Sequence, residues 1–328
     1  MLNPELKLNE ALFSEEVERK ATRDGFGTGL VEAADKDPRV VALTGDLNES
    51  TRVEEFSKKY PERFFECGVA EQNMAAIAAG LGVNNKIPFL SSYATFNPGK
   101  NWETIRTTIV YNQSNVKIAG HHSGVMTGPD GCTHQATEDI ATTRCWPGIK
   151  VIVPCDHIEA KKATLMSAEA EGPFYLRFSR DKSPTITTEE TPFSEKVQTY
   201  WMSENPQATI LGTGHLLYQS LVAAKELEQE GINILVANVP VIKPLDEPGV
   251  VLLAEQTGAF VTAEDHQVMG GLGGAIAELV ALKRPVPMEF IGLQNTFAES
   301  GNPLDIIEKY GMGVGAIMDA VKKVISRK

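Results

Sequence analysis

The ten residues FECGVAEQNM, at positions 65–74, are the stretch around which this sequence is organised. An apolar, strand-like entry turns at a glycine and places Glu71 at the start of a helix rich in small residues. A carboxylate in the first turn of a helix is stabilised by the helix macrodipole and needs no ligand. The stretch alone therefore favours a structural carboxylate over a functional one, and the polar segments elsewhere in the chain decide between them.

Length and composition are those of an ordinary globular protein. The chain has 328 residues, 42% hydrophobic and 23% charged, and this length predicts about two domains. The net charge of −12 argues against nucleic acid but permits a small phosphorylated ligand held by a few arginines. No run approaches the roughly 20 apolar residues that cross a bilayer, and the polar start has no signal-peptide core. The four cysteines lack CxxC spacing, so we expect a reduced cytoplasm and no zinc or disulfide framework.

Strand-like runs alternate with helical patterns in the first 180 residues. Strands are expected at residues 40–44, 63–67, 87–91, 116–120, 149–154 and 174–178, and helices at 13–36, 71–82, 102–111 and 157–170. Continuous apolar strands between helices predict a parallel sheet covered on both faces. Ligands of such sheets bind beyond the carboxyl ends of the strands, where the polar segments of this chain lie.

A second, smaller unit of the same kind follows a polar stretch rich in proline and threonine. We expect domains at residues 14–182 and 200–328, joined by a linker at 183–199. Strands of the second domain are expected at 208–211, 232–239, 259–263 and 287–291, and helices at 216–230, 274–283 and 315–325. The fold class is therefore α/β with two parallel-sheet domains. The glycine run at 270–274 departs from the dinucleotide pattern at Ile276, and no nucleotide-phosphate loop is present.

The densest polar segment is GHHSGVMTGPDGCTHQ, residues 120–135. It holds three of the chain's six histidines beside Asp130 and four glycines. Histidines act as donors or bases near neutral pH, and glycines let the backbone approach a ligand closely. The loop has no helical histidine pair and no cysteine at metal spacing, which argues against a metal site. A metal site and a purely structural loop nevertheless stay open from these residues alone.

Four motifs resemble, in this order, the pyrimidine-binding domain of transketolases. They are GVAEQ at 68–72, YATF at 93–96, DGCTHQ at 130–135 and FSR at 178–180. The second domain resembles the transketolase C-terminal domain through AEDH at 263–266 and the glycines after it. The resemblance implies thiamine diphosphate as cofactor, with Glu71 as a catalytic residue bonded to N1′ of its aminopyrimidine and Phe96 stacked on that ring. A carboxylate shielded from water at N1′ favours the tautomer that takes the thiazolium proton.

The resemblance also implies a phosphorylated sugar as substrate. His134 matches the catalytic histidine that hydrogen-bonds the substrate's oxygens, and Asp130 the aspartate that recognises a sugar hydroxyl. The positions matching the residues that hold the sugar phosphate are Arg19, Ser50, His122 and Arg180. Planar guanidinium groups suit phosphate. Taken singly, Arg19 is typical of a solvated helix charge and Ser50 of a helix N-cap.

Two segments depart from the family pattern. Pro129 stands before Asp130, where the family has an acidic or small residue. NPGKNW at residues 97–102 replaces an apolar and aromatic run. The packing around the pyrimidine is therefore open, and Trp102 is a candidate for an aromatic contact with the cofactor.

The chain lacks the Gly-Asp-Gly element, followed by a distant Asn, that binds diphosphate and magnesium in transketolases. The resemblance therefore implies the C-terminal subunit of a split transketolase, whose N-terminal partner subunit holds most of the Mg2+ site. An α2β2 heterotetramer would transfer a two-carbon ketol unit from a ketose phosphate to an aldose acceptor. Pentose phosphate metabolism in the cytoplasm is the expected setting of this transferase.

Three other functions stay open. A 1-deoxyxylulose-5-phosphate synthase shares the DGxTHQ signature but is a single long chain. The beta subunit of a 2-oxoacid dehydrogenase shares the split architecture but lacks that signature. A non-catalytic α/β binding or regulatory subunit would leave Glu71, His122, Asp130 and His134 without a joint purpose.

Overall fold

The first domain is built on a seven-stranded sheet in the computed structural model, which describes residues 1–328. The strands, in sheet order, are β12 (Val241–Lys243), β6 (Lys150–Ile152), β7 (Phe174–Arg177), β5 (Lys117–His121), β4 (Ile87–Tyr93), β2 (Val40–Thr44) and β3 (Phe64–Glu66). All neighbours are parallel except β12 and β6. All the strands predicted for this sheet are present, with ends that shift by at most two residues.

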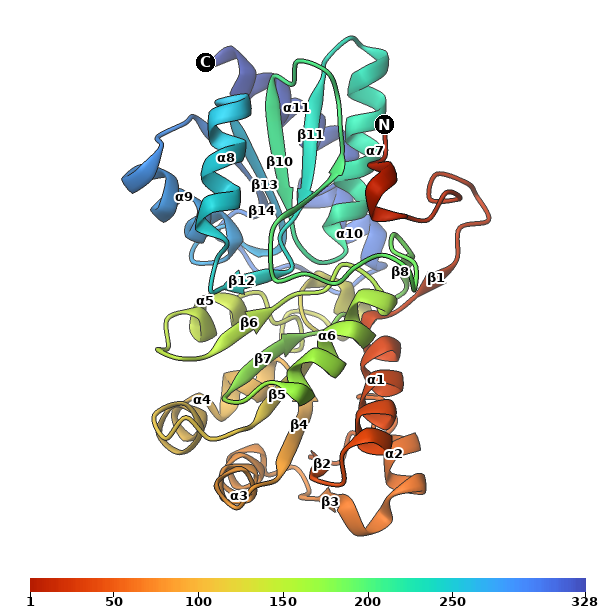
Figure 1. Ribbon diagram of the computed structural model, residues 1–328, viewed down its shortest axis with the longest axis vertical. Coiled ribbons are helices and arrows are strands. Elements are labelled where there is room, and N and C mark those ends of the chain that lie inside the picture. Colours follow the sequence, from red (N-terminus) through yellow and green to blue (C-terminus); the bar gives the residue numbers. More distant parts are fainter.

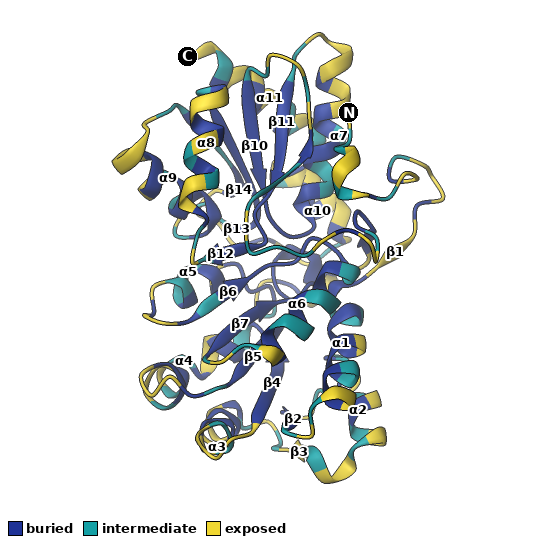
Figure 2. Cartoon of the chain, viewed as in Figure 1, coloured by how far each residue is buried: buried dark blue, intermediate teal, exposed yellow.

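Helices cover both faces of this sheet (Figure 1). They are α1 (Thr22–Lys36), α2 (Glu54–Lys59), α3 (Glu71–Val83), α4 (Trp102–Thr104), α5 (Asp139–Arg144) and α6 (His157–Glu169). Successive strand residues point to opposite faces: Val41 and Leu43 pack with Met74 of α3, whereas Val40 and Ala42 pack with α1 and α6. Figure 2 shows the strands buried between helices that expose only their outer sides. The predicted doubly covered parallel sheet is confirmed.

The second domain has a five-stranded sheet of the same kind. Its strands, in sheet order, are β14 (Met288–Leu293), β13 (Phe260–Gln267), β10 (Ala208–Gly212), β11 (Ile234–Asn238) and the antiparallel β9 (Gln198–Trp201). Its helices are α7 (Leu216–Gln229), α8 (Glu247–Thr257), α9 (Leu272–Lys283), α10 (Pro303–Lys309) and α11 (Val314–Ser326). No helix of the structure has the length and apolar character needed to span a membrane.

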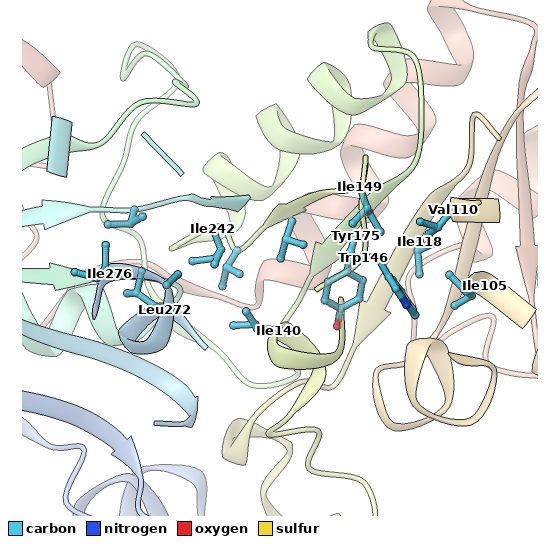
Figure 3. Close-up of a cluster of buried hydrophobic side chains, with 14 of the residues drawn as sticks. Ile105, Val110, Ile118, Ile140, Trp146, Ile149, Tyr175, Ile242, Leu272 and Ile276 are labelled. Carbon is cyan, nitrogen blue, oxygen red and sulfur yellow. The ribbon is translucent and has the colours of Figure 1, made fainter. Parts of the chain in front are cut away.

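The two domains share a hydrophobic core. One cluster of 33 buried residues continues from α3 in the first domain to α9 in the second. In Figure 3, Ile140, Trp146 and Tyr175 lie between Ile118 on one side and Leu272 on the other. The strand β12, which belongs to the second half of the chain, completes the edge of the first sheet. The domains are therefore interlocked, and the first domain cannot move freely relative to the second.

The stretch at residues 183–199, predicted as a linker, is packed at its start. There β8 (Ser183–Pro184) pairs with β1 (Arg19–Lys20). The carboxylate of Asp156 accepts the backbone N–H groups of Ile186 and Thr187 at 2.8 and 2.6 Å. Before it leads to β9, this connection is therefore anchored on the first domain.

The helix predicted at residues 13–36 is wrong in its first part, since α1 begins only at Thr22. Ala21 is extended, and the Asp24 carboxylate accepts its backbone N–H at 3.2 Å, which fixes the helix start. Arg19 consequently lies on β1 rather than on the helix.

Candidate active site

The polar segments of the first domain converge at one edge of its sheet. Ser50, Tyr93, His122 and Arg180 lie at or beyond the carboxyl ends of β2, β4, β5 and β7, which are neighbours in the sheet. Glu71 follows β3 at the border of the same edge. This is the edge where parallel α/β sheets bind ligands.

Glu71 is the first residue of α3, and its side chain is only 2% exposed. Its Oε2 atom lies 2.7 Å from Lys100 Nζ, and its backbone carbonyl accepts Asn101 Nδ2 at 3.1 Å. Oε1 has no hydrogen-bond partner. It lies beside Gly45, 3.7 Å from the position that a Cβ atom would occupy on that glycine. The buried carboxylate is thus paired through one oxygen, and the other has no hydrogen-bond partner in the chain.

A short kinked segment, η3 (Thr95–Lys100), carries Lys100 to this position. Asn97 fixes it by donating to the carbonyls of Leu90 at 2.9 Å and Ala119 at 3.2 Å. Asn101 Nδ2 in turn donates to Asn97 Oδ1 at 3.1 Å. The NPGKNW stretch, which departs from the family pattern, therefore builds a rigid turn that brings Lys100 onto Glu71.

Four rings from three segments form an aromatic wall, which we define as Tyr93, Phe96, His122 and His134. The Tyr93 ring stacks on His122 at 3.8 Å between centroids and on Phe96 at 6.0 Å. Phe96 meets the His134 ring edge-to-face at 5.5 Å. Thr133 Oγ1 lies 2.9 Å from His134 Nδ1, which fixes the orientation of that ring. The wall offers flat, partly apolar surfaces to a ring-shaped ligand.

Beside the wall lies a cationic cluster, which we define as Arg23, Arg52, His122 and Arg180. Arg23 Nη1 lies 2.9 Å from the carbonyl oxygen of Ser50 and 3.4 Å from His122 Nε2. Burial, together with the charges of Arg23, Arg180 and Arg52, lowers the pKa of His122 to about 2. His122 is therefore neutral at pH 7, and its Nδ1 atom is buried without a partner.

The positive charge of this cluster is only partly balanced. Arg52 pairs with Asp24 at 2.7 Å, and Arg180 lies 3.8 Å from Asp130. Arg23 has no carboxylate partner, and its Nε atom is buried without a hydrogen bond. His122 also has a positive φ of 52°, a strained conformation that concentrates at functional sites. Unpaired donors and uncompensated charge suit an anion such as phosphate.

The second domain holds the loop that carries Asp130 and His134. The carboxylate of Asp265, at the end of β13, accepts the backbone N–H of Val125 at 2.9 Å and lies 2.8 Å from His215 Nε2. Farther along the loop, Gln135 Nε2 donates to the carbonyl of Glu299 at 3.1 Å. The exposed Asp130 and the half-buried His134 are thus presented from a loop clamped between the domains.

Two predicted site residues lie elsewhere. Arg19 lines a hollow of about 240 Å3 between the domains, together with Lys182 and His215, because α1 starts too late to include it. Trp102 donates its indole N–H to the carbonyl of Thr142 at 3.0 Å and packs its ring on Trp146 at 5.3 Å. The structure therefore places Trp102 against the core of the first domain, away from the aromatic wall.

Four residues of the site were missed by sequence reasoning: Arg23, Arg52, Tyr93 and Lys100. Arg23 occupies the first turn of α1, and the signal for it was Asp24, which marks the helix start three residues after Ala21. Tyr93 begins the YATF motif, and the motif by itself does not distinguish it as a site residue. Lys100 carries no local signal, because its partner Glu71 is distant in the sequence.

The residues present fit an aminopyrimidine. Such a ring needs a carboxylate for one ring nitrogen and an apolar face to stack on, and Glu71 Oε1 and the aromatic wall supply groups of these kinds. The His, Cys, Asp and Glu side chains of the chain form no group of three or more suited to a metal ion.

Comparison with known proteins identifies both domains. "Transketolase, pyrimidine binding domain" matches residues 18–185, and "Transketolase, C-terminal domain" matches residues 198–317. The chain is 37% identical to a Methanocaldococcus jannaschii protein described as "Putative transketolase C-terminal section", over 93% of this chain and 97% of that one. It is 36% identical to the "6-deoxy-6-sulfo-D-fructose transketolase subunit SqwH" of Clostridium sp. (strain MSTE9), over 96% and 98%.

A solved structure supports the same assignment. The chain resembles a "Split gene transketolase, inactive beta4 tetramer" with a TM-score of 0.87 and 40% identity, over 93% of this chain and 98% of that one. The family predicted from four ordered motifs is thereby confirmed. The chain belongs to the transketolase family and contains its pyrimidine-binding and C-terminal domains.

Proposed function

We propose that this chain is the C-terminal subunit of a two-chain transketolase, which transfers a two-carbon ketol unit from a ketose phosphate to an aldose acceptor. The observation that supports this best is the cationic cluster beside the aromatic wall, at the same sheet edge as the buried carboxylate of Glu71. The phosphate of a phosphorylated sugar suits the cationic cluster, and its hydroxyls suit the polar residues near the aromatic wall.

The residues of the chain divide the work. Glu71 would hold a proton at N1′ of the cofactor, with Phe96 and Tyr93 packed against its ring. His134 and Asp130 would bond the oxygens of the sugar. The phosphate would be held by Arg23, Ser50, His122 and Arg180, so Arg23 replaces Arg19 in the proposal. Thiamine diphosphate, when bound, supplies the nucleophilic carbon and the electron sink of the reaction.

The rest of the cofactor site is proposed to lie on a partner chain. The two relatives named above, which this chain covers almost completely, are described as a section and a subunit. The split-gene relative is described as inactive when it forms a tetramer of one chain type. We propose the same dependence here, with an N-terminal subunit that holds the diphosphate and Mg2+ in an α2β2 assembly. The cytoplasmic location and the pentose phosphate setting stay predictions.

Reconstitution tests the proposal. The chain is co-expressed with a chain that carries the diphosphate motif, and donors and acceptors are screened with thiamine diphosphate and Mg2+. We expect transfer only from the pair. Phosphorylated sugars should be preferred over free sugars by about tenfold or more, the value of a charge-assisted hydrogen bond. Turnover by the single chain, or equal use of free sugars, would contradict the proposal.

The screen should also contain a sulfonated ketose. A sulfonate is a tetrahedral anion like phosphate, and one relative is named for 6-deoxy-6-sulfo-D-fructose. Pyruvate with an aldose phosphate would reveal a 1-deoxyxylulose-5-phosphate synthase, and a 2-oxoacid alone a dehydrogenase subunit. A mixture that shows no circular dichroism change on titration with thiamine diphosphate would favour a non-catalytic subunit.

A further inference from the structure

Lys100 is the one charged side chain that contacts Glu71. Its Nζ atom lies 2.7 Å from Oε2, and no other ion pair or side-chain hydrogen bond reaches the carboxylate. We propose that Lys100 is a positioning residue, which keeps Glu71 ionised and occupies Oε2 so that Oε1 accepts the proton-bearing N1′ of the aminopyrimidine. This inference rests on the proposed role of Glu71.

The burial of Glu71 creates the need for a counter-ion. Removing a carboxylate from water favours its protonated form unless a partner compensates its charge. Glu71 begins α3, so the macrodipole of that helix also favours a negative charge there, but it acts through partial charges rather than a full one. The proposed role of Lys100 therefore rests on its direct ammonium contact with Oε2 at 2.7 Å.

No other ionisable group of the helices and strands packed against α3 takes this place. The elements packed against α3 are β2, β4, η3, α4 (Trp102–Thr104) and η4 (Ile105–Val110). Besides Lys100, their ionisable residues are Tyr93, which stacks on His122, and the exposed Glu103 and Arg106. None of these three is within ion-pair or hydrogen-bond distance of the Glu71 carboxylate.

The position of Lys100 is fixed from both sides. Asn101, its neighbour in sequence, donates to the backbone carbonyl of Glu71 at 3.1 Å and to Asn97 Oδ1 at 3.1 Å. The end of η3 is therefore attached directly to the start of α3. The ammonium reaches Oε2 from the solvent side, with 45% of the Lys100 side chain exposed.

An ionised Glu71 changes the proton balance when the cofactor binds. N1′ of the pyrimidine is unprotonated in neutral water, so its bond to an ionised Oε1 takes up one proton from solvent. A protonated Glu71 would supply its own proton, and none would be taken up. The proton count on binding therefore reports the state of Glu71 beforehand.

Calorimetric titration of thiamine diphosphate with Mg2+ into the two-chain assembly, in two buffers of different ionisation enthalpy, gives this count. At pH 7.5 the native assembly should take up about one proton, K100M close to none, and K100R about one again. K100M should also lower kcat about tenfold while leaving KM for the sugar within about twofold, since the lysine does not touch the sugar.

Two further variants separate the possible outcomes. Lys86→Met removes an exposed lysine without an ion pair, in front of β4, and should behave like the native assembly. If K100M takes up the same proton as the native assembly while E71Q takes up none, the role of Lys100 is wrong and that of Glu71 stands. If E71Q binds with native affinity and proton count, the proposed role of Glu71 fails, and that of Lys100 with it.

Discussion

The two charged regions of the site differ in how their charge is compensated. Glu71 meets its counter-ion inside the chain, with Lys100 at 2.7 Å on one oxygen. In the cationic cluster, Arg23 has no carboxylate partner, and the Arg180–Asp130 pair is separated by 3.8 Å. One region is electrostatically complete without a ligand, and the other is not.

This difference indicates what each region binds. The charge of Glu71 is already balanced by Lys100, so a ligand of this region does not need a positive charge. Guanidinium groups that repel one another gain most when an anion joins them, because each new contact also removes repulsion. The carboxylate region therefore suits a neutral ring, and the cationic cluster suits a phosphate.

Replacing Glu71 should have the largest effect and should not discriminate between substrates. We expect E71Q to lower kcat about 1,000-fold for phosphorylated and free sugars alike, within the usual contribution of proton transfer by a positioned side chain. Transfer assays with the reconstituted pair measure it, with Glu103→Gln, an exposed carboxylate on α4, as the control. Residual turnover by E71Q above a tenth of the native rate would contradict the catalytic role of Glu71.

Replacing Arg23 should act on one substrate class only. Loss of a hydrogen bond to a charged group costs about 1.5–3 kcal/mol, so R23Q should lower kcat/KM for phosphorylated donors about 10- to 150-fold. Free sugars should react as before. Arg19→Gln is the matched control and should change neither value by more than about twofold, since Arg19 lies outside the cluster. If kcat/KM for phosphorylated donors falls equally in both arginine variants, Arg19 also belongs to the phosphate site.

Inorganic phosphate should stabilise the purified chain through the cationic cluster alone. At ten times its dissociation constant, a ligand that binds only the folded state adds about 1.4 kcal/mol to the free energy of unfolding. We expect this gain in the native chain and in K100M, and less than about 0.5 kcal/mol in R23Q at the same phosphate concentration. Chemical denaturation with and without phosphate measures it, and a gain that also disappears in K100M would show that the two regions are coupled.

The architecture could be predicted from the sequence more fully than the details of the site, and the reason is physical. Apolar runs such as residues 40–44 are buried on both faces and predict a strand without knowledge of their neighbours. The sequence pointed to Arg19 and not to Arg23, because the helix start depends on one side-chain contact, from Asp24 to Ala21. The pairing of Lys100 with Glu71 depends on how η3 packs against α3, which no local pattern of residues encodes.

The smallest expected effect concerns pH and the neutral state of His122. Burial and the neighbouring arginines lower its pKa to about 2, whereas an exposed histidine in the unfolded chain titrates near 6.5. The unfolded state therefore binds more protons between these values, so this group makes the chain less stable as pH falls below about 6.5, by at most about 1.4 kcal/mol per pH unit. Burial also raises the pKa of Glu159 and Glu264 to about 7, which acts in the opposite direction over part of this range.

Comparison of the native chain with H122Q isolates the contribution of His122 to the pH dependence of stability, because Glu159 and Glu264 are present in both chains. Between pH 6.5 and 5.5, the native chain should lose more stability than H122Q does, by about 1 kcal/mol in chemical denaturation. A bound phosphate offsets the repulsion from the arginines and allows His122 to take a proton while folded, so saturating phosphate should reduce the difference between the two chains. If the difference is the same with and without phosphate, His122 does not sense the anion, and the cationic cluster is not the phosphate site.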